Sequence, residues 1–170
     1  NYYLNPEWET IYGVHGLGRA FSYDNVYFRK IYTDYDSSLD KPTHLASYRN
    51  YLALGFTSGN VLLSAISGDR GPLPEEFGAT QGSREFSFID HIHGLKELAD
   101  TSLGVFCKSS INRLVLNTTA ATADSIFYTA VISPNSGCIE YTVAGFGDST
   151  LYCDQYGVRT VEQTDVYGDL

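Results

Sequence analysis

The hydrophobic and polar positions follow the period of β-strands along nearly the whole chain. Short apolar runs alternate with polar turns, and three pairs of runs are predicted to form hairpins: 51–56 with 61–66, 103–107 with 111–116, and 149–153 with 157–161. Further strands are predicted at 26–33, 84–89, 126–132 and 139–146. No segment of 12 or more residues has the spacing of an amphipathic helix, and residues 92–98 allow one helical turn at most. The pattern predicts an all-β fold.

The three hairpins are spaced like structural repeats. The pattern Val105-x-Cys107-x5-Arg113 recurs 46 residues later as Leu151-x-Cys153-x5-Arg159, which gives the two arginines equivalent positions, and residues 53–61 align with 105–113 at an offset of 52. An all-β repeat of about 50 residues is typical of β-propeller blades, which bury both faces only by stacking on neighbours. We predict a partial β-propeller of four-stranded antiparallel blades. Chance similarity is the alternative, since hairpins with polar turns recur in any all-β protein.

This repeat also organises the chain into segments. Residues 44–170 are assigned about two to three blades, and residues 1–43 a leading or inserted β segment without further assignment. Four Gly and two Pro within residues 68–82 predict a long exposed loop between blades. At a period near 50, the 170 residues supply three to four blades, fewer than most propellers contain. With no methionine in the sequence, we expect the chain to be a piece of a larger protein.

Composition and charge restrict the classes of function. The chain has 20 acidic and 11 basic side chains, a net charge of -9, which argues against a protein that grips the phosphates of nucleic acid. With 43% hydrophobic residues the chain is too apolar for a disordered segment. No apolar stretch approaches 18 residues, so no membrane span is predicted, and no signal peptide is visible at the N-terminus.

The cysteines and one sequon have ordinary interpretations. Cys107, Cys138 and Cys153 form neither a disulfide framework nor a Cys-x-x-Cys zinc motif, so buried thiols are favoured, with a single disulfide as the alternative. Their oxidation state is left open. Asn117-Thr-Thr119 fits the glycosylation sequon and is interpreted as a chance match.

Two short motifs are candidates for binding chemistry. His91 and His93 would lie on one face of a strand, where Asp90 or Asp100 could add an oxygen ligand to a metal ion; a polar strand or loop is the favoured alternative. The segment 13–18, Gly-Val-His-Gly-Leu-Gly, has neither the glycine spacing nor the Lys-Ser/Thr of a phosphate loop. No catalytic, cofactor-binding or metal-binding residue is therefore assigned, and no cofactor is expected.

The aromatic and acidic residues raise the question of two further kinds of site. Trp8 and the 14 Tyr could form a platform for sugars, although aromatics in sheets more often pack across strands. No two of the many carboxylates stand out as a glycosidase pair. Neither feature singles out a site.

Four stretches from about residue 44 to 161 resemble one known family. These are 44–55, 59–69, 94–114 and, most specifically, Ile132-Ser-Pro-Asn-Ser-Gly-Cys-Ile139 followed by Gly157-Val158. Together they are similar to the β-propeller proteins of tailed-phage tails, the tail tubular protein B or nozzle group and related tail accessory (stabilisation) proteins. Asn50-Tyr51 and the turn at 154–157 depart from the family pattern, and residues 1–43 match nothing in it.

The resemblance implies a structural role without catalytic residues. Such proteins form a ring, commonly of six copies, at the distal end of the tail, where they contact the tail adaptor and tail fibre proteins. The genome is held in the particle and later ejected through the lumen of the ring. We therefore expect a protein of the virion tail, assembled in the host cytoplasm, that is not an enzyme. An acidic lumen would let a polyanion pass without binding it.

Two other functions compete with this expectation. A carbohydrate- or receptor-binding propeller module of a tail would carry aromatic pockets at matching repeat positions, and the aligned repeats share no such aromatic residue. A sialidase-like hydrolase would need convergent arginines and repeated Asp-box motifs, and the sequence has no such motif. The phage-tail interpretation is the leading one.

Overall fold

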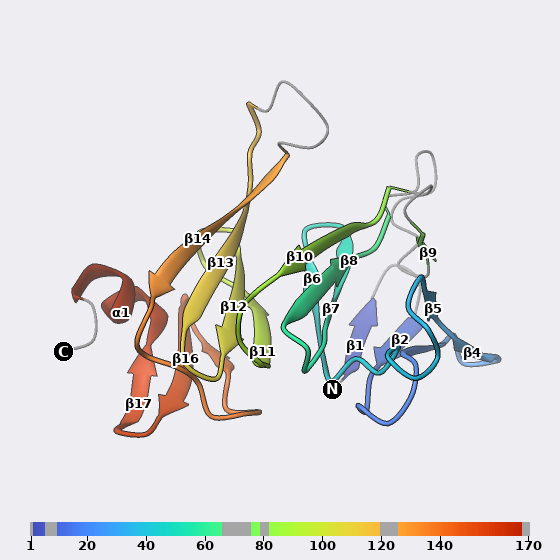
Figure 1. The fold of residues 1–170 in the computed structure, drawn as a ribbon, viewed down its shortest axis with the longest axis horizontal. Coiled ribbons are helices and arrows are strands. Elements are labelled where there is room, and N and C mark those ends of the chain that lie inside the picture. Colours follow the sequence, from blue (N-terminus) through green and yellow to red (C-terminus); the bar gives the residue numbers. More distant parts are fainter. Residues whose placement is uncertain (1, 6–9, 66–75, 79–81, 120–125, 168–170) are drawn as a thin grey trace. The chain divides into compact units, whose positions relative to one another are not determined.

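The computed structural model describes residues 2–5, 10–65, 76–78, 82–119 and 126–167. These residues form seventeen strands and one short helix, so the predicted all-β class is confirmed (Figure 1). The chain divides into two compact units, Asn1–Ile89 and Asp90–Leu170. Among the described residues, no helix has the length and hydrophobicity that a membrane crossing requires.

The first sheet of unit Asn1–Ile89 is an antiparallel meander in the order β1–β2–β3–β4. Its strands are β1 (Tyr2–Asn5), β2 (Thr10–Gly13), β3 (Phe21–Tyr23) and β4 (Phe28–Lys30). Asp24 shapes the β3–β4 turn, because its Oδ1 accepts the backbone N–H groups of Val26 at 3.1 Å and Tyr27 at 2.6 Å. The strand predicted from residue 26 therefore begins only at Phe28, since the turn uses the two residues before it.

The second sheet of this unit has the order β10–β8–β7–β6. Its strands are β6 (His44–Tyr48), β7 (Tyr51–Gly55), β8 (Asn60–Leu63) and β10 (Arg84–Ser87). β7 and β8 pair in the region of the hairpin expected at 51–66. A parallel pair joins β5 (Tyr32–Thr33) to β9 (Glu76–Phe77), and apart from 76–78 and 82 the predicted loop 68–82 lies outside the described residues.

The core of this unit lies between its sheets. Side chains from β2, β6, β7, β8 and β9 meet there with residues of the connecting loops, and the partly buried Tyr35 packs against them. The buried members are Tyr12, Val14, Ala20, Ile31, Leu45, Leu52, Leu54, Phe56, Leu62 and Phe77. Ile31 separates β4 from β5, so the predicted strand 26–33 is interrupted at the residue that enters the core.

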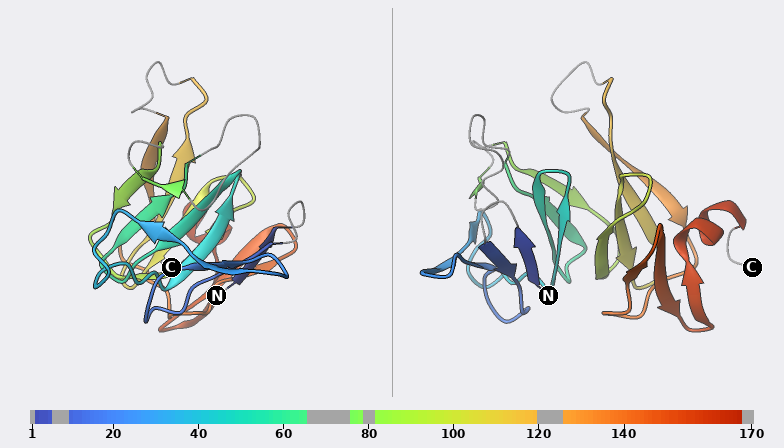
Figure 2. Two further views of the ribbon diagram at one scale, coloured as in Figure 1. Left: turned by 90° about the vertical axis from the view of Figure 1, so that its right-hand side faces the viewer. Right: turned by 180° about the vertical axis from the view of Figure 1, so that it is seen from behind.

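The first sheet of unit Asp90–Leu170 is another four-stranded meander, in the order β11–β12–β13–β14. Its strands are β11 (Ile92–Glu97), β12 (Leu103–Cys107), β13 (Ile111–Leu116) and β14 (Phe127–Ser133). β11 therefore replaces the single helical turn that residues 92–98 were thought to allow. All five residues of β12 are buried. β13 and β14 extend as a ribbon beyond the other two strands (Figure 2).

The second sheet of this unit has three strands and is followed by the helix. It contains β15 (Ala144–Phe146), β16 (Ser149–Asp154) and β17 (Gly157–Thr160), and α1 (Val161–Tyr167) follows directly. The strand predicted at 139–146 is wrong over its first half, because residues 134–143 form an irregular connection from β14 to β15. The helix was not predicted, since seven residues give too little of a 3.6-residue period to recognise.

A compact core joins the two sheets and the helix of this unit. Its buried members are Leu98, Phe106, Ile111, Ile132, Cys138, Tyr152 and Val161. The rings of Phe106 on β12 and Tyr152 on β16 lie 5.8 Å apart between centroids. β16 alternates between half-buried and buried side chains, which is the pattern of a sheet with one fully covered face.

The hairpin turns differ in length, so the sheets repeat less regularly than the sequence spacing predicts. Four residues separate β7 from β8, three separate β12 from β13, and two separate β16 from β17. In the strand ladder Arg113 pairs with Gly104 on β12, and Arg159 pairs with Tyr152 on β16. At the 46-residue offset of the sequence repeat, Tyr152 corresponds to Phe106 and not to Gly104. The predicted equivalence of the two arginines is therefore wrong by two residues of register, because the turn before Arg159 is shorter.

The two arginines also have different partners. Arg113 Nη1 lies 3.3 Å from an Asp100 carboxylate oxygen and 3.1 Å from one of Asp165 on α1. Arg159 Nε lies 2.5 Å from Asp154 Oδ2. Arg113 thus connects its sheet to the helix, and Arg159 stabilises the turn of its own hairpin.

Candidate functional site

A pocket of about 660 Å³ lies at one end of unit Asp90–Leu170, where the β12–β13 turn, the β14–β15 connection and the β16–β17 turn meet. The lining residues come from four separate segments of the chain. They are His93, Lys108, Ser109, Asn135, Ser136, Gly137, Cys138, Ile139, Glu140, Asp154, Gln155, Tyr156 and Arg159. Residues 135–139, in the connection between β14 and β15, form one wall of the pocket.

The β14–β15 connection is fastened to both sheets by backbone hydrogen bonds. The N–H of Cys138 donates to the carbonyl of Cys107 on β12 at 2.9 Å, and the N–H of Ile139 donates to that of Cys153 on β16 at 2.8 Å. Beside them, a Cβ on Gly137 would lie 1.8 Å from the Lys108 carbonyl oxygen. Only glycine fits at this position, because any side chain would collide with the neighbouring turn.

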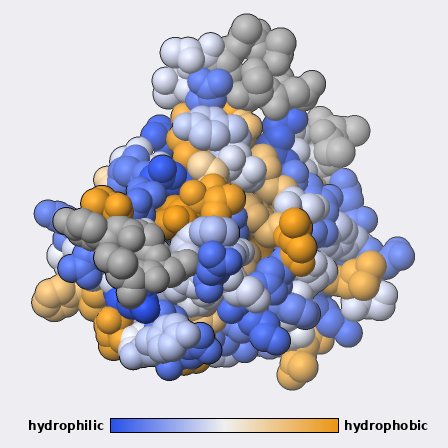
Figure 3. Space-filling model, turned by 60° about the vertical axis from the view of Figure 1, so that its left-hand side comes forward, coloured by the Kyte–Doolittle hydropathy of each residue, from blue (hydrophilic) through white to orange (hydrophobic). Residues whose placement is uncertain are grey.

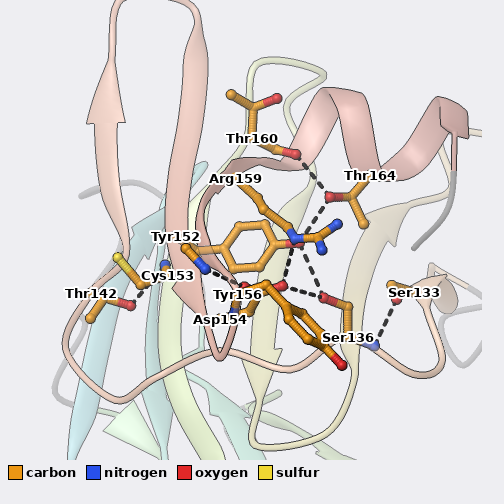
Figure 4. Close-up of polar contacts among 11 residues, drawn as sticks. Ser133, Ser136, Thr142, Tyr152, Cys153, Asp154, Tyr156, Arg159, Thr160 and Thr164 are labelled. Atoms are coloured by element: carbon orange, nitrogen blue, oxygen red, sulfur yellow. Dashed lines mark hydrogen bonds and ion pairs between the residues drawn. The ribbon is translucent and has the colours of Figure 1, made fainter. Parts of the chain in front are cut away.

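Asp154 organises the β16–β17 turn that forms another wall. Its carboxylate is buried, and Oδ1 accepts the backbone N–H groups of Tyr156 at 2.7 Å and Gly157 at 2.9 Å. Oδ2 lies 2.5 Å from Arg159 Nε and accepts the Ser136 hydroxyl at 3.4 Å. Figure 4 shows these groups converging beneath the turn. Because both oxygens are engaged, Asp154 holds the turn in place.

A chain of hydroxyl groups extends from Asp154 to the helix. Ser136 Oγ lies 3.5 Å from the Tyr152 hydroxyl, which lies 2.8 Å from Thr164 Oγ1 on α1 (Figure 4). Thr164 Oγ1 also donates to the carbonyl of Thr160 at 3.0 Å, and Ser133 Oγ accepts the N–H of Ser136 at 3.0 Å. The buried hydroxyls satisfy one another, so these contacts fix the pocket wall to the core.

Asp90 holds the β12–β13 turn in a similar way. Its carboxylate accepts the backbone N–H of Ser109 and, at 2.8 Å, that of His91. Burial raises the pKa of Asp90, but the hydrogen bonds from Ser109 and His91 outweigh burial and lower it below its ordinary value of 3.8. The ionised carboxylate therefore stabilises this turn.

The two predicted histidines have separate environments. His93, on β11, is half-buried, and its Nδ1 donates to the carbonyl of Cys138 at 2.6 Å. His91 is exposed and precedes the strand, and its carbonyl accepts the N–H of Lys108 at 2.9 Å. Within the described ranges, no three His, Cys, Asp or Glu side chains are grouped to hold a metal ion. The structure gives the histidine metal hypothesis no support.

The three cysteines are free thiols near this pocket. Burial raises the pKa of Cys107 to about 11 and also raises that of Cys138, whose Sγ lies 3.5 Å from Thr142 Oγ1. Cys153 is only partly buried. The interpretation as buried thiols holds for Cys107 and Cys138, and a disulfide is absent among these three residues.

The other motifs considered in the sequence do not form a recognisable site. Segment 13–18 precedes β3 instead of a helix, and Gly16 N–H donates to the carbonyl of Pro42 at 3.0 Å. Asn117 Oδ1, in the sequon, accepts the N–H of Thr119 at 3.1 Å in a turn after β13. Trp8 lies outside the described residues. His93, Cys138 and the passage 132–139 were singled out in the sequence, but they were not brought together with Lys108 and the turn at 154–157, because these segments are distant in sequence.

The arrangement is suited to binding. Its buried carboxylate and hydroxyls are engaged with one another, while Lys108, Asn135, Gln155 and Tyr156 are exposed at the rim. The Tyr156 side chain is 78% exposed, and the Arg159 guanidinium lies 5.8 Å from the centre of its ring. The pocket thus combines a fixed wall with accessible polar and aromatic side chains.

Comparisons with known proteins support the fold. The chain is similar to BBS1N, crystallised in complex with ARL6DN, with a TM-score of 0.52 and 13% identity over 89% of this chain and 42% of that one. It is also similar to Saccharomyces cerevisiae Sqt1, with a TM-score of 0.51 and 13% identity over 94% of this chain and 44% of that one. Both have β-propeller-type folds, so the predicted partial β-propeller is confirmed. The chain spans less than half of either structure. No protein-family model and no curated protein matches it.

Proposed function

We propose that the chain is part of a structural protein of a phage tail, a nozzle or tail tubular protein whose copies form a ring around the path of the genome. The proposal rests on the resemblance of residues 132–139 and 157–158 to that family, together with the β-propeller fold. In this role the protein holds DNA in the particle, conducts it during ejection and catalyses no reaction.

The observation that supports the proposal most directly is the position of the resembling passage. Residues 132–139 connect two neighbouring sheets, where Cys138 and Ile139 bond to β12 and β16 and Gly137 packs against the β12–β13 turn. These contacts hold the two sheets of this unit together, which is what a purely structural part of a protein needs. Their resemblance to the family therefore concerns architecture.

Charge supports the same role. With a net charge of -9, the chain repels the phosphates of DNA, and a conduit that bound them would slow transit. We expect six copies in the ring, with the tail adaptor above them and tail fibre proteins beside them, in the virion. The acidic side chains that line the lumen would form a ring of negative potential.

The proposal is tested on the intact protein that contains this sequence. Native mass spectrometry of the purified protein should show a closed oligomer, six copies being expected, and peptides of this chain should occur in purified tailed-phage particles. A protein that stays monomeric at micromolar concentration and is absent from such particles would refute the structural role. A basic lumen in the assembled ring would refute the argument from charge.

A further inference from the structure

We infer that the pocket at the end of unit Asp90–Leu170 binds a neutral glycan, with Tyr156 as the surface on which a sugar ring stacks. This site is additional to the proposed ring assembly, and neither depends on the other. The pocket has four properties that suit such a ligand: an accessible aromatic ring, exposed amides, nearly balanced charge and suitable size.

Tyr156 presents an accessible aromatic ring on a turn whose backbone is held by hydrogen bonds. Its side chain is 78% exposed, while its backbone N–H donates to Asp154 Oδ1 at 2.7 Å. The Arg159 guanidinium, held by Asp154, lies 5.8 Å from the ring centroid. An exposed ring on a tight, hydrogen-bonded turn loses little conformational entropy when a ligand stacks on it. The apolar C–H face of a pyranose is such a ligand.

The polar side chains around the ring match the hydroxyl groups of a sugar. Asn135 and Gln155 are exposed at the pocket and each offers an amide oxygen as acceptor and an amide nitrogen as donor. His93 donates through Nδ1 to the Cys138 carbonyl, so in the neutral ring Nε2 is an acceptor. A hydroxyl both donates and accepts, and adjacent hydroxyls of a pyranose can bind one amide through both of its atoms.

The charges of the pocket favour a neutral ligand. Asp154 and Arg159 form an ion pair at 2.5 Å and largely neutralise each other. Lys108 and Glu140, the remaining cationic and anionic side chains of the lining apart from His93, are opposite in sign. A site for a phosphate or an acidic peptide would need an excess of cationic groups. This lining has little excess of either sign.

The size of the pocket limits the ligand to a short part of a glycan. Its volume of about 660 Å³ lies inside the range of small-molecule sites. One or two sugar units can enter, and the open end allows a longer chain to continue into solvent. The ligand class is therefore a neutral mono- or disaccharide unit of a larger glycan.

Saturation-transfer NMR on the intact protein tests this site with maltose, lactose and N,N′-diacetylchitobiose as probes. We expect transfer to the ring protons of at least one probe at millimolar concentration. Tyr156→Ala should weaken its binding about tenfold or more. Tyr156→Phe, which retains the ring, should bind nearly as wild type, and Asn135→Ala should weaken binding less than Tyr156→Ala. Tyr128→Ala, which removes an exposed tyrosine of β14 outside the pocket, is the matched control and should bind unchanged.

Several outcomes would overturn the inference. One is that none of the three sugars gives transfer; another is that Tyr156→Ala and Tyr128→Ala bind equally well. Preferential binding of 3′-sialyllactose or of a triglutamate peptide at this pocket would also refute a neutral-glycan site. Native mass spectra of the same variants distinguish this result from the assembly proposal, because Tyr156→Ala should leave the oligomer intact.

Discussion

The two sheets of unit Asp90–Leu170 differ in how completely they are covered. In β11–β14, one of the two inner strands, β12, has every residue buried, whereas in β15–β17 only one face of the inner strand β16 is fully buried and β15 is exposed throughout. Phe146 and Val158 are 75% and 69% exposed. Figure 3 brings this side of the molecule forward and shows hydrophobic patches among hydrophilic surface. β12 thus lacks the alternation of buried and half-buried side chains that β16 shows and that marks a sheet covered on one side.

The largest loss of stability is expected when a buried side chain of β12 is removed. Phe106→Ala removes a side chain that is 0% exposed and contacts Tyr152, so it should lower the free energy of unfolding by about 3–5 kcal/mol. Val158→Ala, on the less covered sheet, should change it by less than about 0.5 kcal/mol. Urea unfolding followed by circular dichroism measures both. Equal losses of unfolding free energy in the two variants would contradict the difference in burial between the two sheets.

A smaller effect is expected from the connection between the sheets. Gly137→Ala places a methyl group 1.8 Å from the Lys108 carbonyl oxygen, which forces the connection and the β12–β13 turn apart. It should destabilise the protein by about 1–3 kcal/mol. Gly145→Ala, on β15, meets only the flexible end of Lys96 at 3.4 Å and is the matched control. If the two variants unfold at the same urea concentration, the connection does not set the spacing of the sheets.

The hydroxyl chain that joins the less covered sheet to the helix should contribute less. Tyr152→Phe removes the hydroxyl that lies 2.8 Å from Thr164 Oγ1 but keeps the ring, and should cost about 1 kcal/mol. Thr164→Val and the double variant complete a double-mutant cycle. The two effects should be less than additive because the residues share one bond; strict additivity would show that the bond contributes nothing.

Acidic pH should weaken the β12–β13 turn, which the Asp90 carboxylate stabilises. The pKa of this carboxylate is lowered in the folded protein, so its stabilising effect is fully present above its ordinary value of 3.8 and is lost as the pH falls through the lowered pKa. Between about pH 5 and pH 2, wild type should therefore lose more stability than Asp90→Asn. Urea unfolding across this range measures the difference. Parallel pH profiles would show that the carboxylate does not hold the turn.

The smallest effect is expected from chemical modification of the three thiols in the folded protein. Cys153 is partly buried, while Cys107 and Cys138 are buried and have raised pKa values. At pH 8, Ellman's reagent should therefore modify Cys153 in the folded protein and the other two only after unfolding. Cys153→Ser should abolish the reaction of the folded protein. Rapid reaction of Cys107 without denaturant would contradict the burial of β12.

The sequence predicted the features that depend on neighbouring residues. The β12–β13 hairpin could be recognised in the sequence as two apolar runs that flank a polar turn, and so could the β16–β17 hairpin. The repeat was visible as well, although turns of different length shifted Arg113 and Arg159 out of equivalence. Local pattern and spacing were therefore enough for the fold class.

Features that depend on contacts between distant segments were not predicted. The strand expected at 139–146 failed because residues around Cys138 bond to two sheets at once, and their hydrophobic side chains serve that connection. The pocket brings His93 and Lys108 to residues of the 154–157 turn, and no sequence spacing indicates this. The short helix is stabilised by Val161 in the core and by Thr164, not by an amphipathic repeat.

The proposed function requires that these sheets are consecutive blades of a propeller that assembles into a ring. Cryo-electron microscopy of the intact, assembled protein tests it most directly. We expect a closed ring in which β11–β14 and β15–β17 stack as neighbouring blades, a further sheet covers the exposed side of β15–β17, and acidic side chains line the lumen. A monomer in which Phe146 and Val158 stay in solvent and no lumen exists would contradict it.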